Sequence, residues 1–176
     1  MNKKKTNAKT IKNRKPMTSQ EKTRFLTEAG IIAALYAVIT FANMGLSAGA
    51  IQIRISEALC ILPCFTAAAV PGLFVGCIFA NLITGGVVWD VIFGSLTTLL
   101  AAFLTRQFKD KRFLASVPPI VCNMFVIPII LSKAYGSEQA IGALSLSVGI
   151  GEFISAGVIG QIIYSVLDKN RHIFKS

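Results

Sequence analysis

Residues 51–65 are IQIRISEALCILPCF, and this stretch decides how the rest of the chain is interpreted. Its first six residues alternate between isoleucine and a polar residue, a period of two that predicts an extended segment. Ser56 and Glu57 then predict a helix start, because serine caps a first turn and a carboxylate suits the helix dipole there. A long apolar run follows, so the presence of Arg54 and Glu57 at its edge needs an explanation.

The charge content indicates what kind of chain surrounds this stretch. Only 15% of the 176 residues are charged, whereas a soluble domain averages about 25%. Between positions 25 and 105 the charged side chains are Glu28, Arg54, Glu57 and Asp90. A stretch of that length with so few charges cannot form a water-exposed surface. The sequence therefore predicts an all-α integral membrane protein.

Apolar runs separated by small or polar residues predict six transmembrane helices. A capping box at positions 18–21 starts the first helix, and Pro63 kinks the second. Pro71 and Gly72 predict a tight connection to the third helix, which Gly85 and Gly86 end. The predicted spans are residues 25–44, 57–70, 72–84, 88–105, 113–131 and 141–167, with an extended outer loop between the first two.

The distribution of lysine and arginine predicts the orientation. Nine of the 18 lie in the first 24 residues, and two further clusters follow at 106–112 and 169–175. Loops rich in Lys and Arg stay in the cytoplasm, and four spans and then two separate the three clusters. Both termini are therefore expected to be cytoplasmic. We expect a disordered basic tail over residues 1–17, one membrane domain over 18–168 and a second basic tail over 169–176.

The formal net charge of +10 raises the question of nucleic-acid binding. A basic tail beside a first membrane span is more typical of contact with anionic lipid headgroups. We therefore expect the lipid bilayer, and not a nucleic acid, as the partner of these charges.

In this topology, polar side chains from five segments fall in the outer half of the bundle. Glu152 is the strongest candidate, because a carboxylate inside a span is costly and marks a functional site. Taken singly, Glu57 and Asp90 suit helix starts, Trp89 suits the membrane interface and Asn81 suits helix packing. Together they predict a binding cup open to the outside, formed by Asn43, Gln52, Arg54, Glu57, Asn81, Trp89, Asp90 and Glu152.

Two stripes of small residues lie closer to the inner side. Small residues four apart let another helix approach closely. The stripe on the third helix, Gly72, Gly76 and Ala80, favours packing within the bundle. For the stripe on the first helix, an internal neighbour and an external protein partner remain equally open: Ala29, Ala33 and Ala37.

Motifs for chemistry are missing from the sequence. It contains no G-x-x-x-x-G-K-[ST] loop, no G-x-S-x-G, no H-E-x-x-H and no cysteine–histidine set suited to a metal. We therefore expect a protein that is not an enzyme and that holds no cofactor or metal. Uptake by binding and translocation is the favoured class.

Several segments together resemble the QueT family. These are residues 52–59 with the Leu62-Pro63 pair after them, Asn81 after a glycine-rich helix, residues 90–94, and residues 151–153. The resemblance covers about residues 20–170. It implies a substrate-binding S component of an energy-coupling factor transporter in a bacterial plasma membrane. A scaffold membrane subunit and two ATPase subunits would be its partners, with ATP hydrolysed by the latter.

The resemblance also implies a ligand, a queuosine precursor or related 7-deazaguanine. The cup's formal charge of −2, from three carboxylates and one guanidinium, suits a cationic amine with several N–H donors. We expect Arg54 to pair with Glu57, and Glu57 to accept donors from the ring edge. Glu152 would take a second donor or the amine, and Trp89 would stack on the ring. The alternatives are an S component for another vitamin such as thiamine, a stand-alone proton-coupled carrier with Glu152 as the proton site, and a membrane enzyme.

Overall fold

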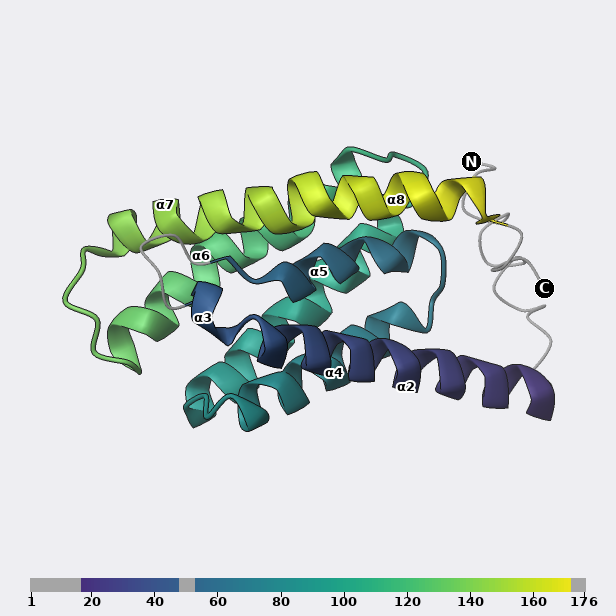
Figure 1. Ribbon diagram of the computed structural model, residues 1–176, viewed down its shortest axis with the longest axis horizontal. Helices are drawn as coiled ribbons and strands as arrows, with labels where there is room; N and C mark the ends of the chain where they lie inside the picture. The colour runs from purple at the N-terminus through teal and green to yellow at the C-terminus, as the bar shows by residue number, and fades with distance from the viewer. Residues whose placement is uncertain (1–16, 48–52, 172–176) are drawn as a thin grey trace, which may run out of the picture.

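The computed structural model describes residues 17–47 and 53–171, and every regular element in these ranges is helical. The predicted all-helical fold is confirmed. The described part forms six continuous helical segments that run side by side along the long axis of the molecule (Figure 1). The predicted tail before position 17, Gln52 in the outer loop and the last five residues lie outside the described residues.

The first segment begins where the sequence predicts it. Helix α2 spans Ser19–Ala42 and the short α3 spans Met44–Ser47. Thr18 and Glu21 form the capping box: the Glu21 N–H donates to Thr18 Oγ1 at 3.3 Å, and Thr18 N–H donates to Glu21 Oε2 at 2.7 Å. Asn43 ends α2, and its side-chain amide donates to the carbonyl of Ile39 at 2.8 Å.

The second segment differs from the prediction. A 3₁₀ helix, η1, spans Ile55–Cys64, where a longer helix over residues 57–70 was expected. Ser56 does not cap it. Its hydroxyl instead accepts from Thr40 Oγ1 at 2.7 Å. The inner end of η1 is held from outside the segment, because Arg106 Nη1 donates to the Pro63 carbonyl at 2.7 Å. A long 3₁₀ helix is uncommon, so these side-chain contacts stabilise a conformation that local propensity alone does not favour.

The third segment starts earlier than predicted. Helix α4 spans Ala69–Ile83, and Pro71 lies in its first turn, not in a connection. The N–H groups of a first turn have no partner within the helix, so a proline costs little there. The predicted end is confirmed, since α4 stops before Gly85, which adopts a positive φ of 73°.

The remaining segments agree with the predicted spans to within a few residues. A π-helical turn, η2, covers Asp90–Gly94 and continues into α5, Ser95–Gln107. The 3₁₀ turn η3, Leu114–Ser116, continues into α6, Val117–Lys133. The last segment joins α7, Ile141–Glu152, the π-helical η4, Phe153–Ile159, and α8, Gly160–Lys169.

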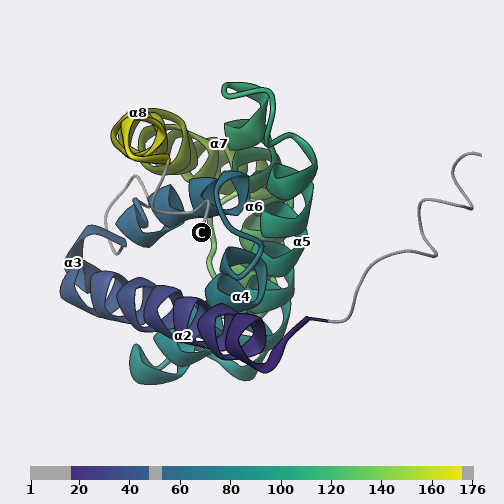
Figure 2. The same cartoon turned by 90° about the vertical axis from the view of Figure 1, so that its right-hand side faces the viewer.

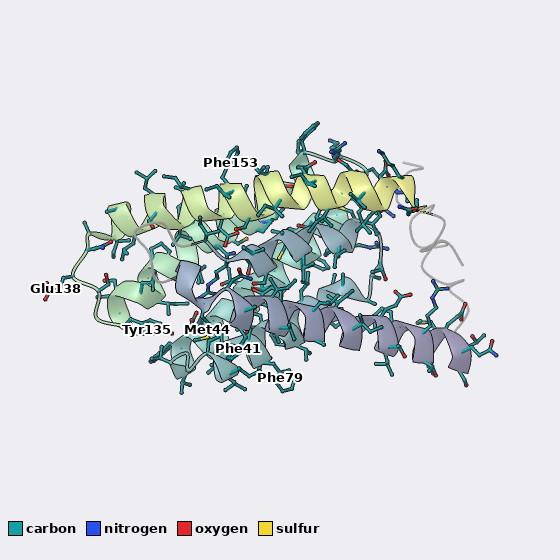
Figure 3. All side chains as sticks on the ribbon, viewed as in Figure 1. Phe41, Met44, Phe79, Tyr135, Glu138 and Phe153 are labelled. Carbon is teal, nitrogen blue, oxygen red and sulfur yellow. The ribbon has the colours of Figure 1, made fainter. Side chains whose placement is uncertain are left out.

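The ends of the described chain lie at the same end of the bundle. The start of α2 and the end of α8 are at the same end of the bundle in Figure 1. Arg112, which follows α5, is bound to α8 through hydrogen bonds to Gln161 and Ser165. The residues labelled Met44, Tyr135 and Glu138 in Figure 3 lie at the opposite end. The described members of the basic clusters, such as Arg24, Arg112 and Lys169, thus lie toward the end where α2 begins and α8 ends.

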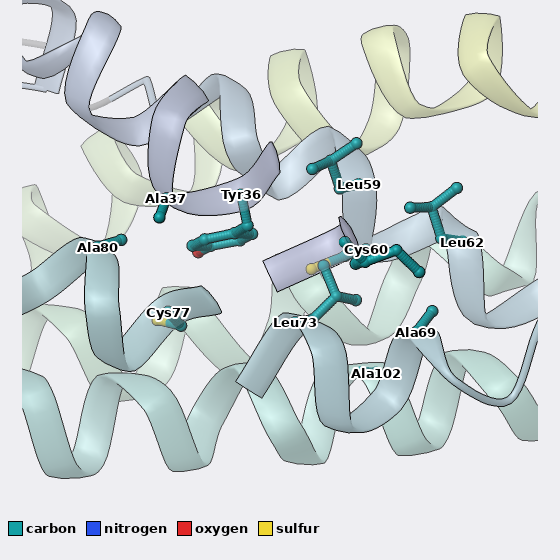
Figure 4. Packing of buried hydrophobic residues seen from close by; sticks show 11 residues of the cluster. Tyr36, Ala37, Leu59, Cys60, Leu62, Ala69, Leu73, Cys77, Ala80 and Ala102 are labelled. Atoms are coloured by element: carbon teal, nitrogen blue, oxygen red, sulfur yellow. The ribbon is translucent and has the colours of Figure 1, made fainter. Parts of the chain in front are cut away.

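The core is built around η1, which packs against α2, α5, α8 and η4 (Figure 2). Its main cluster combines Tyr36 of α2, Cys60 of η1, Leu73 and Cys77 of α4, and Ala102 of α5 (Figure 4). These side chains are at most 1% exposed. The outer halves of α6 and α7 form a separate cluster with Ile127, Ile130 and Val148 at its centre.

The two stripes of small residues face each other. A Cβ added at Gly72 would lie 2.8 Å from the Ala29 carbonyl oxygen, and one at Gly76 would lie 2.8 Å from that of Ala33. Backbone contact this close needs glycine on one side and alanine on the other. Of the two neighbours left open for Ala29, Ala33 and Ala37, the structure favours the internal one, because α4 of the same chain packs against this face.

Three helical segments are long and apolar enough to cross a membrane: Ser19–Ala42, Leu114–Lys133 and Ile141–Lys169. Helix η1 and helix α4 are apolar but shorter. The 15 residues of α4 rise about 22 Å, less than the ~30 Å of a hydrocarbon core. Large apolar side chains such as Phe79 and Phe153 point outward, 53% and 61% exposed (Figure 3). This exposed apolar surface is typical of a protein surrounded by lipid.

Candidate ligand-binding site

Arg54 forms an ion pair with Asp90. Its Nη2 lies 3.4 Å from Asp90 Oδ2, and the two side chains are 23% and 6% exposed. The predicted pair between Arg54 and Glu57 is wrong, because the guanidinium points across to the start of η2. Burial lowers the pKa of Arg54, but the attraction of Asp90 and of weaker neighbours more than offsets this, so the pKa lies above its ordinary value. Arg54 is a fixed cation at this end of the bundle.

Asp90 is held through its Oδ2 and its backbone carbonyl, while its Oδ1 is buried without a hydrogen-bond partner among the described residues. Its Oδ2 also accepts from the Tyr135 hydroxyl at 3.2 Å, and that hydroxyl in turn accepts from the Val87 N–H at 3.2 Å. The Asn81 side-chain amide donates to the Asp90 carbonyl at 3.1 Å. A Cβ at Gly94 would lie 2.7 Å from Asp90 Oδ1, so this oxygen faces its own helix. The arrangement positions Asp90 to hold Arg54.

Glu57 is engaged within the core. The side chain is 1% exposed. The Tyr36 hydroxyl donates to Oε1, and the Cys60 thiol donates to Oε2 at 3.0 Å. Both carboxylate oxygens therefore have a donor from the chain itself. This geometry does not fit the expectation that Glu57 accepts the donors of a ligand.

Glu152 is different. It ends α7, is 4% exposed, and accepts from the Asn123 side-chain amide through Oε1 at 2.9 Å. Its Oε2 is buried and has no hydrogen-bond partner among the described residues. A carboxylate oxygen left without a donor in an apolar bundle is costly, so it marks a place where an external donor is expected.

Glu152 lines a small cavity that lies toward the outer end of the bundle. The cavity measures about 10 Å³ and is lined by Arg54, Asn123, Ile127, Val148 and Glu152. That volume accommodates about one water molecule. Acceptor and donor groups from the segment before η1, from α6 and from α7 thus meet in one place. The chemistry available there is hydrogen bonding with a carboxyl acceptor and a guanidinium donor, between apolar walls.

Trp89 lies elsewhere. Its side chain is 60% exposed and stacks on Phe93 with ring centroids 5.4 Å apart. It lines an apolar surface groove of about 500 Å³ between η2 and the end of α6. The structure therefore does not place Trp89 at the Arg54–Glu152 cavity, where its stacking on a ligand was expected.

The other predicted site residues have structural contacts. Asn43 caps α2, and Asn81 supports the backbone of Asp90. Gln52 lies outside the described residues. The structure therefore brings together Arg54, Asp90 and Glu152 from the predicted set, places Glu57 in the core beside them, and separates Trp89 and Asn43 from them.

Three residues that the sequence analysis missed contact the predicted carboxylates. Asn123 bonds to Glu152, Tyr135 bonds to Asp90, and Tyr36 bonds to Glu57. The amide of Asn123 inside the apolar run of residues 117–131 was the signal that could have identified it. Within the described ranges, no group of three or more His, Cys, Asp or Glu side chains could hold a metal ion.

Comparisons with known proteins place this geometry in context. The sequence model of the QueT transporter family matches residues 26–169. The "Queuosine precursor transporter QueT" of Lactococcus lactis subsp. cremoris (strain MG1363) is 35% identical over 102 residues, which cover 53% of this chain and 59% of that relative. The chain thus spans about three fifths of the relative's length in this match. No solved structure matches the chain significantly.

Proposed function

The chain belongs to the QueT transporter family, and we propose that it is the substrate-binding membrane subunit of an energy-coupling factor importer. In this proposal it captures a queuosine precursor or a related 7-deazaguanine from outside the cell. The observation that carries the proposal is Glu152, whose buried Oε2 has no donor among the described residues and whose side chain lines the same cavity as Arg54. The name of the Lactococcus lactis relative supports the substrate class.

The proposed orientation in the plasma membrane follows from charge. The described basic residues at the start of α2, after α5 and at the end of α8 lie toward one end of the bundle, and Lys- and Arg-rich segments stay cytoplasmic. The cavity lies toward the other end, which an importer must expose to the outside. With six helical segments crossing the membrane, both termini would be cytoplasmic. The shorter helices η1 and α4 would lie within the membrane, surrounded by the longer helices of the bundle.

Substrate binding requires the cavity to expand. Ligand pockets are roughly 300–1,000 Å³, whereas the space between Arg54 and Glu152 is about 10 Å³. The outer halves of α6 and α7 have their own hydrophobic cluster, separate from the core around η1. We infer that this helix pair moves as a unit to admit the base. The contact of Tyr135 with Asp90 and Val87 would be the first to break.

The proposal assigns ATP hydrolysis to two partner ATPase subunits, which act through a scaffold membrane subunit. Because α4 covers the Ala29–Ala33–Ala37 stripe, the scaffold would contact another face of the bundle. Co-expression with candidate partner subunits, followed by affinity purification of this chain, tests the assignment. Recovery of both ATPases supports it. Transport by the chain alone, reconstituted in vesicles and driven by a proton gradient, would contradict it.

The ligand class is tested separately by calorimetric titration of the purified protein. We expect a 7-deazaguanine base to bind more tightly than thiamine, riboflavin or biotin. Binding of one of these vitamins, without binding of the deazaguanine, would overturn the substrate class while leaving the role as a binding subunit open to the copurification test.

A further inference from the structure

We propose that Arg54 and Glu152 together recognise the lactam edge of the base, with Arg54 donating to the ring carbonyl oxygen and Glu152 accepting the ring N–H and the neighbouring amino group. This inference rests on the proposed function, because it names the atoms by which that same site selects its ligand. It assigns recognition to Glu152 and a supporting role to the two other carboxylates nearby.

Glu152 supplies the acceptor. An ionised carboxylate has about four lone-pair positions and no donor. One position on Oε1 is used by the neutral amide of Asn123 at 2.9 Å, and Oε2 is unused by the described residues. Since the side chain is 4% exposed, water satisfies little of this capacity. A ligand that brings one or two N–H donors would fill it.

Arg54 supplies the donor on the same cavity. A guanidinium has five N–H donors in a planar fork. In the part of the chain that the structure describes, its hydrogen bond is made by Nη2 to Asp90, at 3.4 Å. Donors therefore remain for a ligand oxygen. Asp90 holds the guanidinium in place from the side, so the orientation is set before a ligand arrives.

The other two carboxylates are used differently. Glu57 has Tyr36 and Cys60 as donors. Asp90 accepts from Arg54 and Tyr135 through Oδ2, whereas its Oδ1 is buried, faces Gly94 and has no hydrogen-bond partner among the described residues. Neither lines the cavity. The acceptor opposite Arg54 is therefore Glu152.

The pair of groups defines a pattern on the ligand. A 2-amino-6-oxo base presents a carbonyl oxygen, a ring N–H and an amino group in a row along one edge. The oxygen suits Arg54, and the two donors suit the carboxylate of Glu152. A 6-amino base reverses this order and would place an amino group against the guanidinium. Ile127 and Val148 line the same cavity and offer apolar surface to the faces of the ring.

The test compares three bases that differ only along this edge: 7-deazaguanine, 7-deazahypoxanthine, which lacks the 2-amino group, and 7-deazaadenine. Each is titrated into the full chain in detergent, as the wild type and as Glu152→Gln. Glutamine replaces one acceptor by an N–H₂ group that faces the ligand donors. Glu138→Gln makes the same chemical change on an exposed loop residue and serves as the control.

We expect the wild type and the Glu138→Gln control to bind 7-deazaguanine at least roughly tenfold more tightly than either other base. In Glu152→Gln the preference over 7-deazahypoxanthine should fall toward one. The ratio of the two dissociation constants is measured on one preparation of the same variant, so it does not depend on how much of that variant is folded. A Glu152→Gln protein that binds more weakly but keeps the wild-type ratio would overturn the inference and leave the proposed function intact. A wild type that binds none of the three bases would overturn both.

Discussion

Arg54 forms its ion pair with Asp90, 36 residues further along the chain, although Glu57 lies three residues away. The contact joins the segment before η1 to the start of η2. It leaves Glu57 to Tyr36 and Cys60, and it turns the guanidinium toward the cavity that contains Glu152. The function of each carboxylate follows from which donors it already has.

Replacing Asp90 by asparagine should disturb the position of Arg54. The variant removes the charge that faces the guanidinium and one acceptor of the Tyr135 hydroxyl. We expect a loss of roughly 1–3 kcal/mol in the free energy of unfolding and at least a severalfold weaker binding of 7-deazaguanine. Thermal melting and calorimetric titration measure the two effects. Asp110→Asn, an exposed change near the other end of the bundle, is the control and should alter neither. Normal melting and normal affinity in Asp90→Asn would contradict the positioning role.

Replacing Glu57 by glutamine should affect stability first. Glutamine can still accept from Tyr36, but its amino group would meet the Cys60 thiol without a suitable acceptor geometry. The expected loss is roughly 1–3 kcal/mol, the cost of a buried polar group without a partner. Thermal melting of the purified variant beside the wild type checks this. A variant that melts like the wild type would show that Glu57 does not support the core.

The contact between α2 and α4 predicts opposite effects for two glycine substitutions. Gly76→Ala places a Cβ 2.8 Å from the Ala33 carbonyl oxygen and 2.8 Å from Tyr36 Cβ, so the helices must separate. Such overpacking costs about 1–3 kcal/mol. Gly30 of α2 belongs to neither stripe, and a Cβ added there meets nothing within 4 Å. Inside a helix, alanine is more stable than glycine by roughly 0.5–1 kcal/mol. Melting temperatures should therefore fall for Gly76→Ala and hold or rise for Gly30→Ala. Equal behaviour of the two variants would contradict the close packing.

Trp89 provides a fluorescence test, because it is the chain's only tryptophan. Its exposed side chain lines the apolar surface groove beside α6 and not the Arg54–Glu152 cavity. A brominated detergent should quench its emission, and saturating 7-deazaguanine should not protect it. Trp89→Ala should bind the base within about threefold of the wild type, a difference of about 0.7 kcal/mol. Protection by the base, or a large loss of affinity in Trp89→Ala, would place the ring at the ligand.

Much of the fold could be predicted from the sequence, because apolar run lengths and glycine positions mark where helices begin and end. The capping box at Thr18 and the end of α4 before Gly85 were predicted correctly. The extent of η1 was not. The start of α4 was missed because Pro71 is equally compatible with a turn and with a first helical turn. The end of η1 was missed because the contact that supports it comes from Arg106, far along the chain.

The site could be predicted in part. The outer-half carboxylates were identified because charges in apolar runs stand out, and Glu152 was the strongest candidate for that reason. Which donor each carboxylate has could not be predicted, because Arg54 and Asp90 meet through the packing of separate helices. The two small-residue stripes were also visible in the sequence. Their contact with each other depends on how α2 and α4 are paired, which periodicity does not specify.

The central claim is that Glu152, and not Glu57, binds the ligand. The most direct measurement is a calorimetric titration of 7-deazaguanine into wild type, Glu57→Gln and Glu152→Gln, with the folded fraction of each checked by size-exclusion chromatography. The account predicts that Glu152→Gln weakens binding at least roughly tenfold, or about 1.4 kcal/mol, while folded Glu57→Gln stays within about threefold of the wild type. Loss of binding in Glu57→Gln together with normal binding in Glu152→Gln would contradict it.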